Sequence, residues 1–131
     1  MASVIYPKCK ENLWKANIDL DTDTVKVALV DTGTYSYSVT HEAYDDLSGV
    51  VGTPVELTNV VVSNGSIAGD DITFSSVTGN TVETVILYVD SGTPSTSYLI
   101  AYIDDITNSP IIPNGGDLTI EWDDSSNIVV L

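Results

Sequence analysis

Few side chains in this sequence could act as a nucleophile or a general base. The only histidine, His41, lies in a polar loop rich in Asp, and the chain has no Gly-x-Ser-x-Gly turn. Hydrolysis of the Ser-His-Asp type needs a histidine base that a carboxylate orients. The only cysteine, Cys9, lies between Lys8 and Lys10, which would favour its thiolate, but no catalytic partner is evident for it. We therefore expect that the protein is not an enzyme.

Carboxylates are the side chains that could bind a metal ion. Asp19, Asp21 and Asp23 have the spacing of the first calcium ligands in an EF-hand loop. Thr24 and Val30 stand where that loop needs Gly and Glu. Four pairs of acids near loop ends either bind calcium or are ordinary turn residues, and we favour turns, with no metal and no cofactor. If calcium does bind, the last two pairs are the best candidates. The pairs are Asp45-Asp46, Asp70-Asp71, Asp104-Asp105 and Asp123-Asp124.

The chain is strongly acidic, and its charge is unevenly distributed. Nineteen Asp and Glu oppose four Lys, there is no Arg, and the net charge is −15. Residues 1–26 hold all four Lys and four acids (4 − 4 = 0), so the net charge belongs to residues 27–131. Such a body repels phosphate backbones and anionic lipid surfaces, so we expect neither nucleic acid nor a membrane as a partner. The charge indicates either a basic or metal-rich partner or, as we favour, simple solubility.

No part of the sequence has the pattern of a targeting signal or a membrane span. Its start lacks a basic region followed by a long apolar run, and no apolar stretch approaches roughly 20 residues. A single cysteine cannot form an internal disulfide. We expect a protein that is made in a reducing cytoplasm.

Val, Ile and Thr are abundant, and turn residues recur at roughly strand-length intervals, which predicts an all-β protein. We expect a single antiparallel β-sandwich of about seven to eight strands, immunoglobulin-like or jelly-roll-like, over residues 25–131. Residues 1–24 are expected to form a separate arm or short helix, with helix at 8–17, and a helical turn is expected at 40–47. The predicted strands are 25–30, 55–63, 71–77, 82–89, 98–104, 117–122 and 128–131, with a tight turn at Asn64-Gly65.

The apolar pattern also predicts the core. Residues 82–89 and 98–104 are apolar on both faces, which is typical of central strands between two layers. In residues 117–122 the apolar side chains alternate with Thr119 and Glu121, which should point outward. We predict one core that contains Leu29, Phe74, Leu87, Ile120 and Trp122.

Six short segments spread over nearly the whole chain carry a further indication of function. They are Lys-Glu-Asn-Leu-Trp14, Asp-Thr-Val-Lys26-Val-Ala-Leu-Val, Thr-His41-Glu-Ala-Tyr44-Asp-Asp46, Gly69-Asp-Asp-Ile-Thr-Phe74, Asp90-Ser-Gly-Thr-Pro-Ser-Thr-Ser-Tyr-Leu-Ile-Ala-Tyr102 and Gly115-Gly-Asp-Leu-Thr-Ile-Glu-Trp122. Taken together and in this order, they resemble a family of small phage virion proteins that are minor structural or capsid-associated components. The chain departs from that family at Ser-Gly49-Val-Val-Gly52-Thr-Pro54, where relatives tend to have a turn rich in Gly and Tyr.

The resemblance implies a structural part of a phage particle, made in the host cytoplasm and located in the virion. We expect a capsid decoration, or cement, protein that binds the major capsid protein or another virion protein. It would stabilise the shell as any bound ligand stabilises its partner. We also expect a homo-oligomer. The alternative is a tail- or fibre-associated module that recognises a receptor or a carbohydrate, and an unrelated β-sandwich is a third interpretation.

The N-terminal arm is the predicted contact surface, because aromatic residues flanked by cations are favoured anchors at interfaces. The arm has too few apolar neighbours in sequence to bury its apolar side chains locally. Deletion of residues 2–10 is therefore expected to leave a folded domain. The alternative left open is that Trp14 folds back and caps one end of the sandwich. The predicted interface residues are Tyr6, Lys8, Lys10, Leu13, Trp14 and Lys15.

Overall fold

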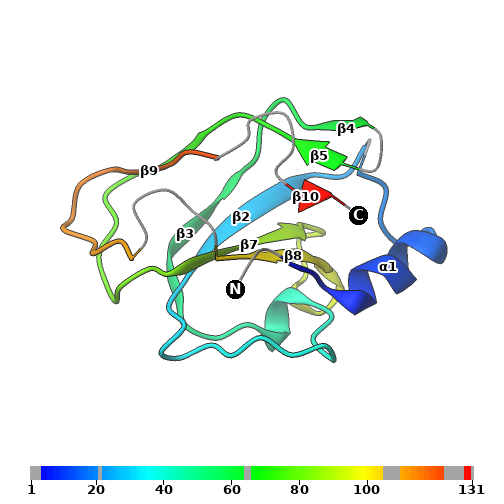
Figure 1. The fold of residues 1–131 in the computed structure, drawn as a ribbon, viewed down its shortest axis with the longest axis horizontal. Helices are drawn as coiled ribbons and strands as arrows, with labels where there is room; N and C mark the ends of the chain where they lie inside the picture. The colour runs from blue at the N-terminus through cyan, green and yellow to red at the C-terminus, as the bar shows by residue number, and fades with distance from the viewer. Residues whose placement is uncertain (1–3, 21, 64–65, 105–109, 123–128, 131) are drawn as a thin grey trace.

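The protein is built around one five-stranded antiparallel sheet (Figure 1). The computed structural model describes residues 4–20, 22–63, 66–104, 110–122 and 129–130. Among the described strands, the order of the large sheet is β1-β8-β7-β2-β3, with β1 and β3 at its two edges. Its strands are β1 (Val4–Ile5), β2 (Val25–Val30), β3 (Val50–Glu56), β7 (Thr84–Val89) and β8 (Leu99–Ile103).

Two smaller antiparallel sheets and a short helix complete the described fold. One small sheet has the order β10-β5-β4 and the other pairs β6 with β9. Figure 1 shows β4, β5 and β10 on one side of the large sheet and the segment 31–47 on the other. The remaining elements are α1 (Pro7–Trp14), β4 (Val61–Ser63), β5 (Ser66–Ala68), β6 (Ile72–Phe74), β9 (Leu118–Ile120), β10 (Val129–Val130) and the 3₁₀ turns η1 (Tyr44–Asp46) and η2 (Pro94–Thr96).

The central strands β2, β7 and β8 are buried on both faces. Every residue of these strands is buried except Lys26, which is partly exposed. Buried Thr84 is the one polar residue of β7, and its hydroxyl donates a hydrogen bond of 2.6 Å to the carbonyl of Ile103. Near-continuous apolar strands are typical of a sheet that is covered on both sides. The prediction of two central strands at 82–89 and 98–104 is confirmed.

One face of the large sheet, here called the tyrosine face, is covered by an irregular segment. The register pairs Lys26 with Tyr88 and Ile86 with Tyr102, so these side chains lie on the same face. The ring of Tyr102 lies 5.4 Å from that of Tyr37, and the ring of Tyr88 lies 4.8 Å from that of Tyr44, measured between centroids. Aromatic side chains of the segment 31–47 therefore pack on this face.

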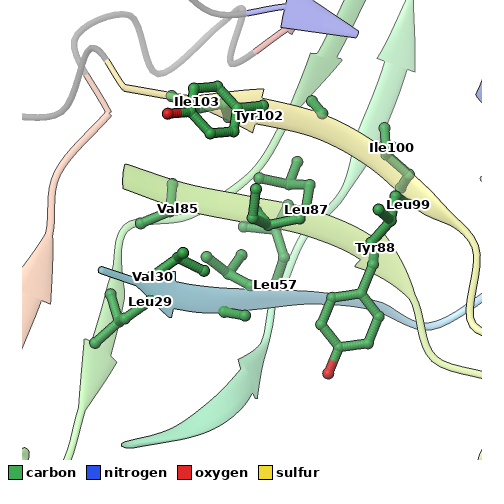
Figure 2. Packing of buried hydrophobic residues seen from close by; sticks show 14 of the residues in the cluster. Leu29, Val30, Leu57, Val85, Leu87, Tyr88, Leu99, Ile100, Tyr102 and Ile103 are labelled. Atoms are coloured by element: carbon green, nitrogen blue, oxygen red, sulfur yellow. The ribbon is translucent and has the colours of Figure 1, made fainter. Parts of the chain in front are cut away.

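The opposite face is aliphatic. Val27 and Leu29 of β2 face Leu87 and Val85 of β7, and Figure 2 shows several of these side chains packed together. In the β6–β9 pair the apolar residues are buried, whereas Thr73 and Thr119 between them are exposed and their hydroxyls lie 3.1 Å apart. The predicted alternation in residues 117–122 is confirmed. The predicted core residues belong to one hydrophobic cluster: Leu29, Phe74, Leu87, Ile120 and Trp122.

The segment 55–63, predicted as one strand, is divided between two sheets. β3 ends at Glu56 and β4 begins at Val61. Between them Asn59 turns the chain with a φ of 53°, and the Asp70 carboxylate accepts a hydrogen bond from its side-chain amide. β3 also begins before the predicted strand. Gly52, with a φ of 70°, lies where the β2–β3 register is shifted by a bulge, so a stretch expected to be loop remains in the sheet.

The N-terminal residues that the structure describes pack against the main core, and they include the short helix that was one of the two forms expected for residues 1–24. Ile5 pairs with Ala101 of β8, and the Tyr6 amide donates to the carbonyl of Ile100 at 3.0 Å. Both Ile5 and Tyr6 are buried in the same hydrophobic cluster as the strands. Deletion of residues 2–10 would therefore remove β1 and a buried tyrosine, and we no longer expect the truncated chain to fold normally.

Helix α1 is shorter than the predicted 8–17. It begins at Pro7, a residue type suited to the first helical position, because proline has no amide hydrogen to leave unpaired there. It ends at Trp14, since Ala16 adopts a left-handed conformation with a φ of 60°. The amide of Asn17 then donates to the carbonyl of Asn12 at 2.8 Å, which is the bond of a Schellman C-cap.

Three shorter predictions have mixed outcomes. The helical turn expected at 40–47 is reduced to η1, and Ala43 is at its N-cap position. Asn64-Gly65 lies outside the described residues, but Ser63 and Ser66 on either side of it are paired as in a hairpin. The strands predicted at 71–77 and 128–131 are found as the shorter β6 and β10.

The two tryptophans provide an internal test of the core. Trp122 is 9% exposed, and its indole N–H donates to the carbonyl of Asp70 at 2.9 Å, whereas Trp14 is 87% exposed. We expect Trp122→Ala to lower the free energy of unfolding by about 3–5 kcal/mol, as a large-to-small core substitution does. Trp14→Ala should change it by less than about 0.5 kcal/mol. Equal losses in urea denaturation of the two variants would contradict this assignment.

Candidate functional site

Only one side of helix α1 packs against the core. Cys9 and Asn12 are buried, and Leu13 is partly buried against the core. Trp14 is five residues after Cys9, so on a helix with 3.6 residues per turn it points to nearly the opposite side. Its indole is 87% exposed, which excludes the alternative that Trp14 folds back onto the sheet.

Two of the three lysines of this region, Lys10 and Lys15, lie beside Trp14. Lys10 precedes Trp14 by one helical turn and is exposed, as is the adjacent Lys15. Glu11 accepts ion pairs from Lys8 at 3.1 Å and from Lys15 at 3.4 Å. The hydrogen bond from Lys8 is the largest cause that lowers the pKa of the Glu11 carboxyl. We call the exposed side chains of Lys10, Trp14 and Lys15 the α1 patch.

Tyr6 differs from the other predicted interface residues, because its side chain is fully buried in the protein itself. Its hydroxyl lies 2.7 Å from that of Tyr35, and the Tyr35 hydroxyl lies 2.7 Å from Nδ1 of His41. If Tyr6 donates to Tyr35 and Tyr35 donates to a neutral His41, all three groups are satisfied. Tyr6 therefore belongs to the core, and no sequence pattern indicated that it would pair with a residue in the segment 31–47.

The segment 31–47 also helps to hold α1 in place, because Asn12 of the helix forms hydrogen bonds of its own. Buried Asn12 donates from its side-chain amide to Glu42 at 3.2 Å and accepts from the side chain of Asn17 at 3.0 Å. The segment 31–47 thus contacts α1 through Glu42, and it contacts Tyr6, directly before α1, through the Tyr35 hydroxyl. These contacts fix the direction in which the α1 patch faces.

Cys9 is a buried core residue and not a reactive thiol. Its side chain is buried in the hydrophobic cluster, and desolvation is the main cause that raises the pKa of the Cys9 thiol to about 12. The opposing effect of nearby Lys10 is smaller. The favourable influence of cations that the sequence suggested is therefore outweighed by burial.

Several of the acidic residues that the structure describes accept hydrogen bonds from backbone amides. The Asp46 carboxylate accepts from the amides of Glu42 and Ala43, and the Asp71 carboxylate accepts from the amide of Trp122. Within the described ranges, no three His, Cys, Asp or Glu side chains are grouped so that they could hold a metal ion. Asp21, Asp105 and the pair Asp123-Asp124 lie outside those ranges.

Comparison with known proteins adds no assignment. No protein-family model matches this chain, and a search of curated proteins finds no match. Of the helices among the described residues, none has the length and apolar character needed to cross a bilayer. The resemblance to small phage virion proteins, the absence of enzymatic activity and the expected partners stay predictions.

The buried tyrosines make stability sensitive to alkaline pH. Burial is the main cause that raises the pKa of both Tyr6 and Tyr35, and burial also raises the pKa of Cys9. Because the unfolded chain loses these protons near the ordinary pKa values while the folded chain retains them, stability falls as the pH rises through that range. We expect a lower urea midpoint at about pH 10.5 than at about pH 8.

A conservative variant isolates the contribution of Tyr6. Tyr6→Phe loses one hydrogen bond and should lower the free energy of unfolding by about 1 kcal/mol near neutral pH. The difference in the free energy of unfolding between this variant and the unmodified protein should shrink above about pH 10. The unmodified protein loses stability as Tyr6 deprotonates on unfolding, whereas the variant has no phenol at this position. Tyr98→Phe, outside the Tyr6–Tyr35–His41 group, is the matched control. A difference that grows with pH would contradict the assignment.

We expect calcium to leave the stability of the protein unchanged. The Asp46 and Asp71 carboxylates already accept hydrogen bonds from backbone amides, and no three of the described His, Cys, Asp or Glu side chains are grouped so that they could hold a metal ion. The melting temperature should therefore be the same in excess calcium and in a chelator. A large rise with calcium that the chelator reverses would show that a site exists, and substitution of Asp123 and Asp124 would then test whether that pair forms it.

Proposed function

We propose that this chain is a non-enzymatic structural protein of a phage virion, a capsid decoration protein that docks on the shell through the α1 patch. The observation that carries the proposal is the exposure of Trp14 on a helix whose other side is locked into the core. Tryptophan is among the residues most often found at the energetic centre of protein interfaces. A partner that covers Trp14 gains apolar contact area without any rearrangement of α1.

The charge distribution supports docking at this end of the molecule. Lys10 and Lys15 are exposed beside Trp14, whereas residues 27–131 carry the whole net charge of −15. An acidic or neutral surface is therefore approached most favourably by α1, with the acidic body directed away from it. A major capsid protein or another virion protein with an acidic surface fits this requirement. The acidic body of a second copy also fits it, which is consistent with the expected homo-oligomer.

We also propose that the three sheets together form an open β-sandwich of the immunoglobulin-like or jelly-roll-like kind. In this interpretation the sheets β4-β5-β10 and β6-β9 together take the place of the second sheet. Support comes from the burial of β2, β7 and β8 on both faces and from the single hydrophobic cluster that includes residues of the small sheets. Such a rigid body would hold the α1 patch in a fixed orientation on a particle.

The test is reloading of particles of the encoding phage from which the protein is absent. Trp14→Ala should reduce the apparent affinity about 30-fold, as expected for loss of an interface hot spot of about 2 kcal/mol. Lys10→Glu should also reduce loading, and the reduction should be larger at low salt, where charge interactions are less screened. Bound protein is measured after sedimentation of the particles.

Ile112→Ala is the matched control, because Ile112 is 77% exposed and apolar. Figure 1 shows the segment 110–117, in orange, at the opposite end of the long axis from α1. This variant should load normally. If Trp14→Ala also loads to full occupancy with unchanged affinity, α1 is not the docking site. Absence of the protein from purified particles would overturn the proposed function itself.

A further inference from the structure

A small hollow lies at one end of the tyrosine face of the large sheet. It has a volume of about 200 Å³. β2, β3 and β7, the η1 turn and the loop that contains η2 all contribute to its walls. The lining includes Lys26, Tyr44, Thr53, Tyr88, Asp90 and Thr93.

The sheet register places a charged and an aromatic side chain side by side in this hollow. Lys26 on β2 is paired with Tyr88 on β7, so both side chains leave the sheet on the same face. The ring of Tyr44, from η1, packs on that of Tyr88 with centroids 4.8 Å apart and an angle of 44° between the planes. The Lys26 ammonium lies 2.9 Å from the Asp90 carboxylate.

The loop that borders the hollow is held by its own hydrogen bonds. The Asp90 carboxylate accepts from the amide of Gly92 at 3.0 Å as well as from Lys26. The Ser97 hydroxyl donates to the carbonyl of Thr93 at 2.8 Å and accepts from the amide of Ser91 at 3.1 Å. Polar groups that are fixed before a ligand arrives lose little conformational freedom on binding.

The charges of the hollow favour a neutral ligand. Lys26 and Asp90 compensate each other, and each influences the other's ionisation. The hydrogen bond to Asp90 is the main cause that raises the pKa of Lys26, and the same bond is the main cause that lowers the pKa of Asp90. An anion would also be repelled by a protein with a net charge of −15. The pair nevertheless keeps hydrogen-bonding capacity, because an ammonium group has three donors and a carboxylate has about four acceptor sites.

The shape and chemistry of the hollow favour a ring with both apolar and hydroxyl-bearing parts. The partly exposed ring of Tyr44, backed by the buried ring of Tyr88, offers aromatic surface, while Lys26 and Asp90 offer a donor and an acceptor beside it. A drug-sized ligand usually occupies about 300–1,000 Å³, so this hollow suits a smaller molecule. A pyranose has an apolar C–H face that packs on aromatic rings and a rim of hydroxyls that pair with polar side chains. We propose that the hollow binds one neutral pyranose unit of a glycan.

The experiment uses the full-length ¹⁵N-labelled protein and the neutral methyl glycosides of glucose, galactose, mannose and N-acetylglucosamine. At least one should shift amide signals of residues 90–97 and of Thr53 in two-dimensional NMR, with a dissociation constant of about 1–10 mM for a ligand this small. Methyl glucuronide, which is anionic, should bind more weakly. The α1 patch shares no residue with the hollow, so failure of this test leaves the docking proposal unaffected.

Variants assign the binding to the hollow. Tyr44→Ala should weaken the affinity about tenfold through loss of aromatic contact, whereas Tyr44→Phe should keep it within about threefold. Thr93→Trp adds bulk at an exposed rim position and should abolish binding even if Tyr44→Ala proves unstable. Tyr98→Ala, which removes a tyrosine that does not line the hollow, is the control. The proposal is overturned if no glycoside shifts these signals at about 50 mM, if Thr93→Trp binds normally, or if the glucuronide binds best.

Discussion

The fold depends on one constraint: β2, β7 and β8 are apolar on both faces, so the large sheet must be covered twice. Burial of apolar surface contributes about 25 cal/mol per Å², and an uncovered face would expose a large apolar patch. The described chain has too few elements to supply two regular layers. The β6–β9 pair and the sheet β10-β5-β4 contribute to the aliphatic side, while on the tyrosine face a loop and a 3₁₀ turn cover the sheet with aromatic rings.

Covering a sheet with a loop has a consequence for α1. A loop that packs on a sheet brings polar groups into the contact, and those that become buried need hydrogen-bond partners. The Tyr35 hydroxyl finds them in Tyr6 and His41, and Glu42 accepts from buried Asn12 of α1. The loop that closes the tyrosine face therefore also anchors the inner side of the helix. Exposed apolar residues are ordinary on protein surfaces. Trp14 is distinguished because its helix is anchored on the opposite side and because lysines stand beside it.

The sequence was sufficient to predict the elements in which a local pattern and the tertiary environment agree. The strand at 25–30 and the alternation around Leu118 and Ile120 follow directly from the periodicity of apolar residues. The division of 55–63 could not be predicted, because it depends on Asp70, which is distant in sequence and accepts from Asn59. The burial of Tyr6 was missed for the same reason, since its partner Tyr35 is 29 residues away. The hollow around Lys26 likewise needs the register of β2 with β7, which composition does not reveal.

The distribution of cations connects the two proposed sites. Of the four lysines in the chain, Lys26 is paired with Asp90 inside the hollow, and the other three lie in α1 or directly after it. The α1 end is therefore the part of the molecule from which exposed positive charge reaches the solvent. At physiological salt, interactions between exposed charges are largely screened beyond about 8 Å. An acidic surface that approaches α1 is therefore attracted by the lysines there and is repelled little by the acidic body. The hollow, in contrast, has its charges internally compensated and gains nothing from long-range attraction. Recognition at α1 is expected to depend on salt, whereas recognition in the hollow depends on shape and hydrogen bonding.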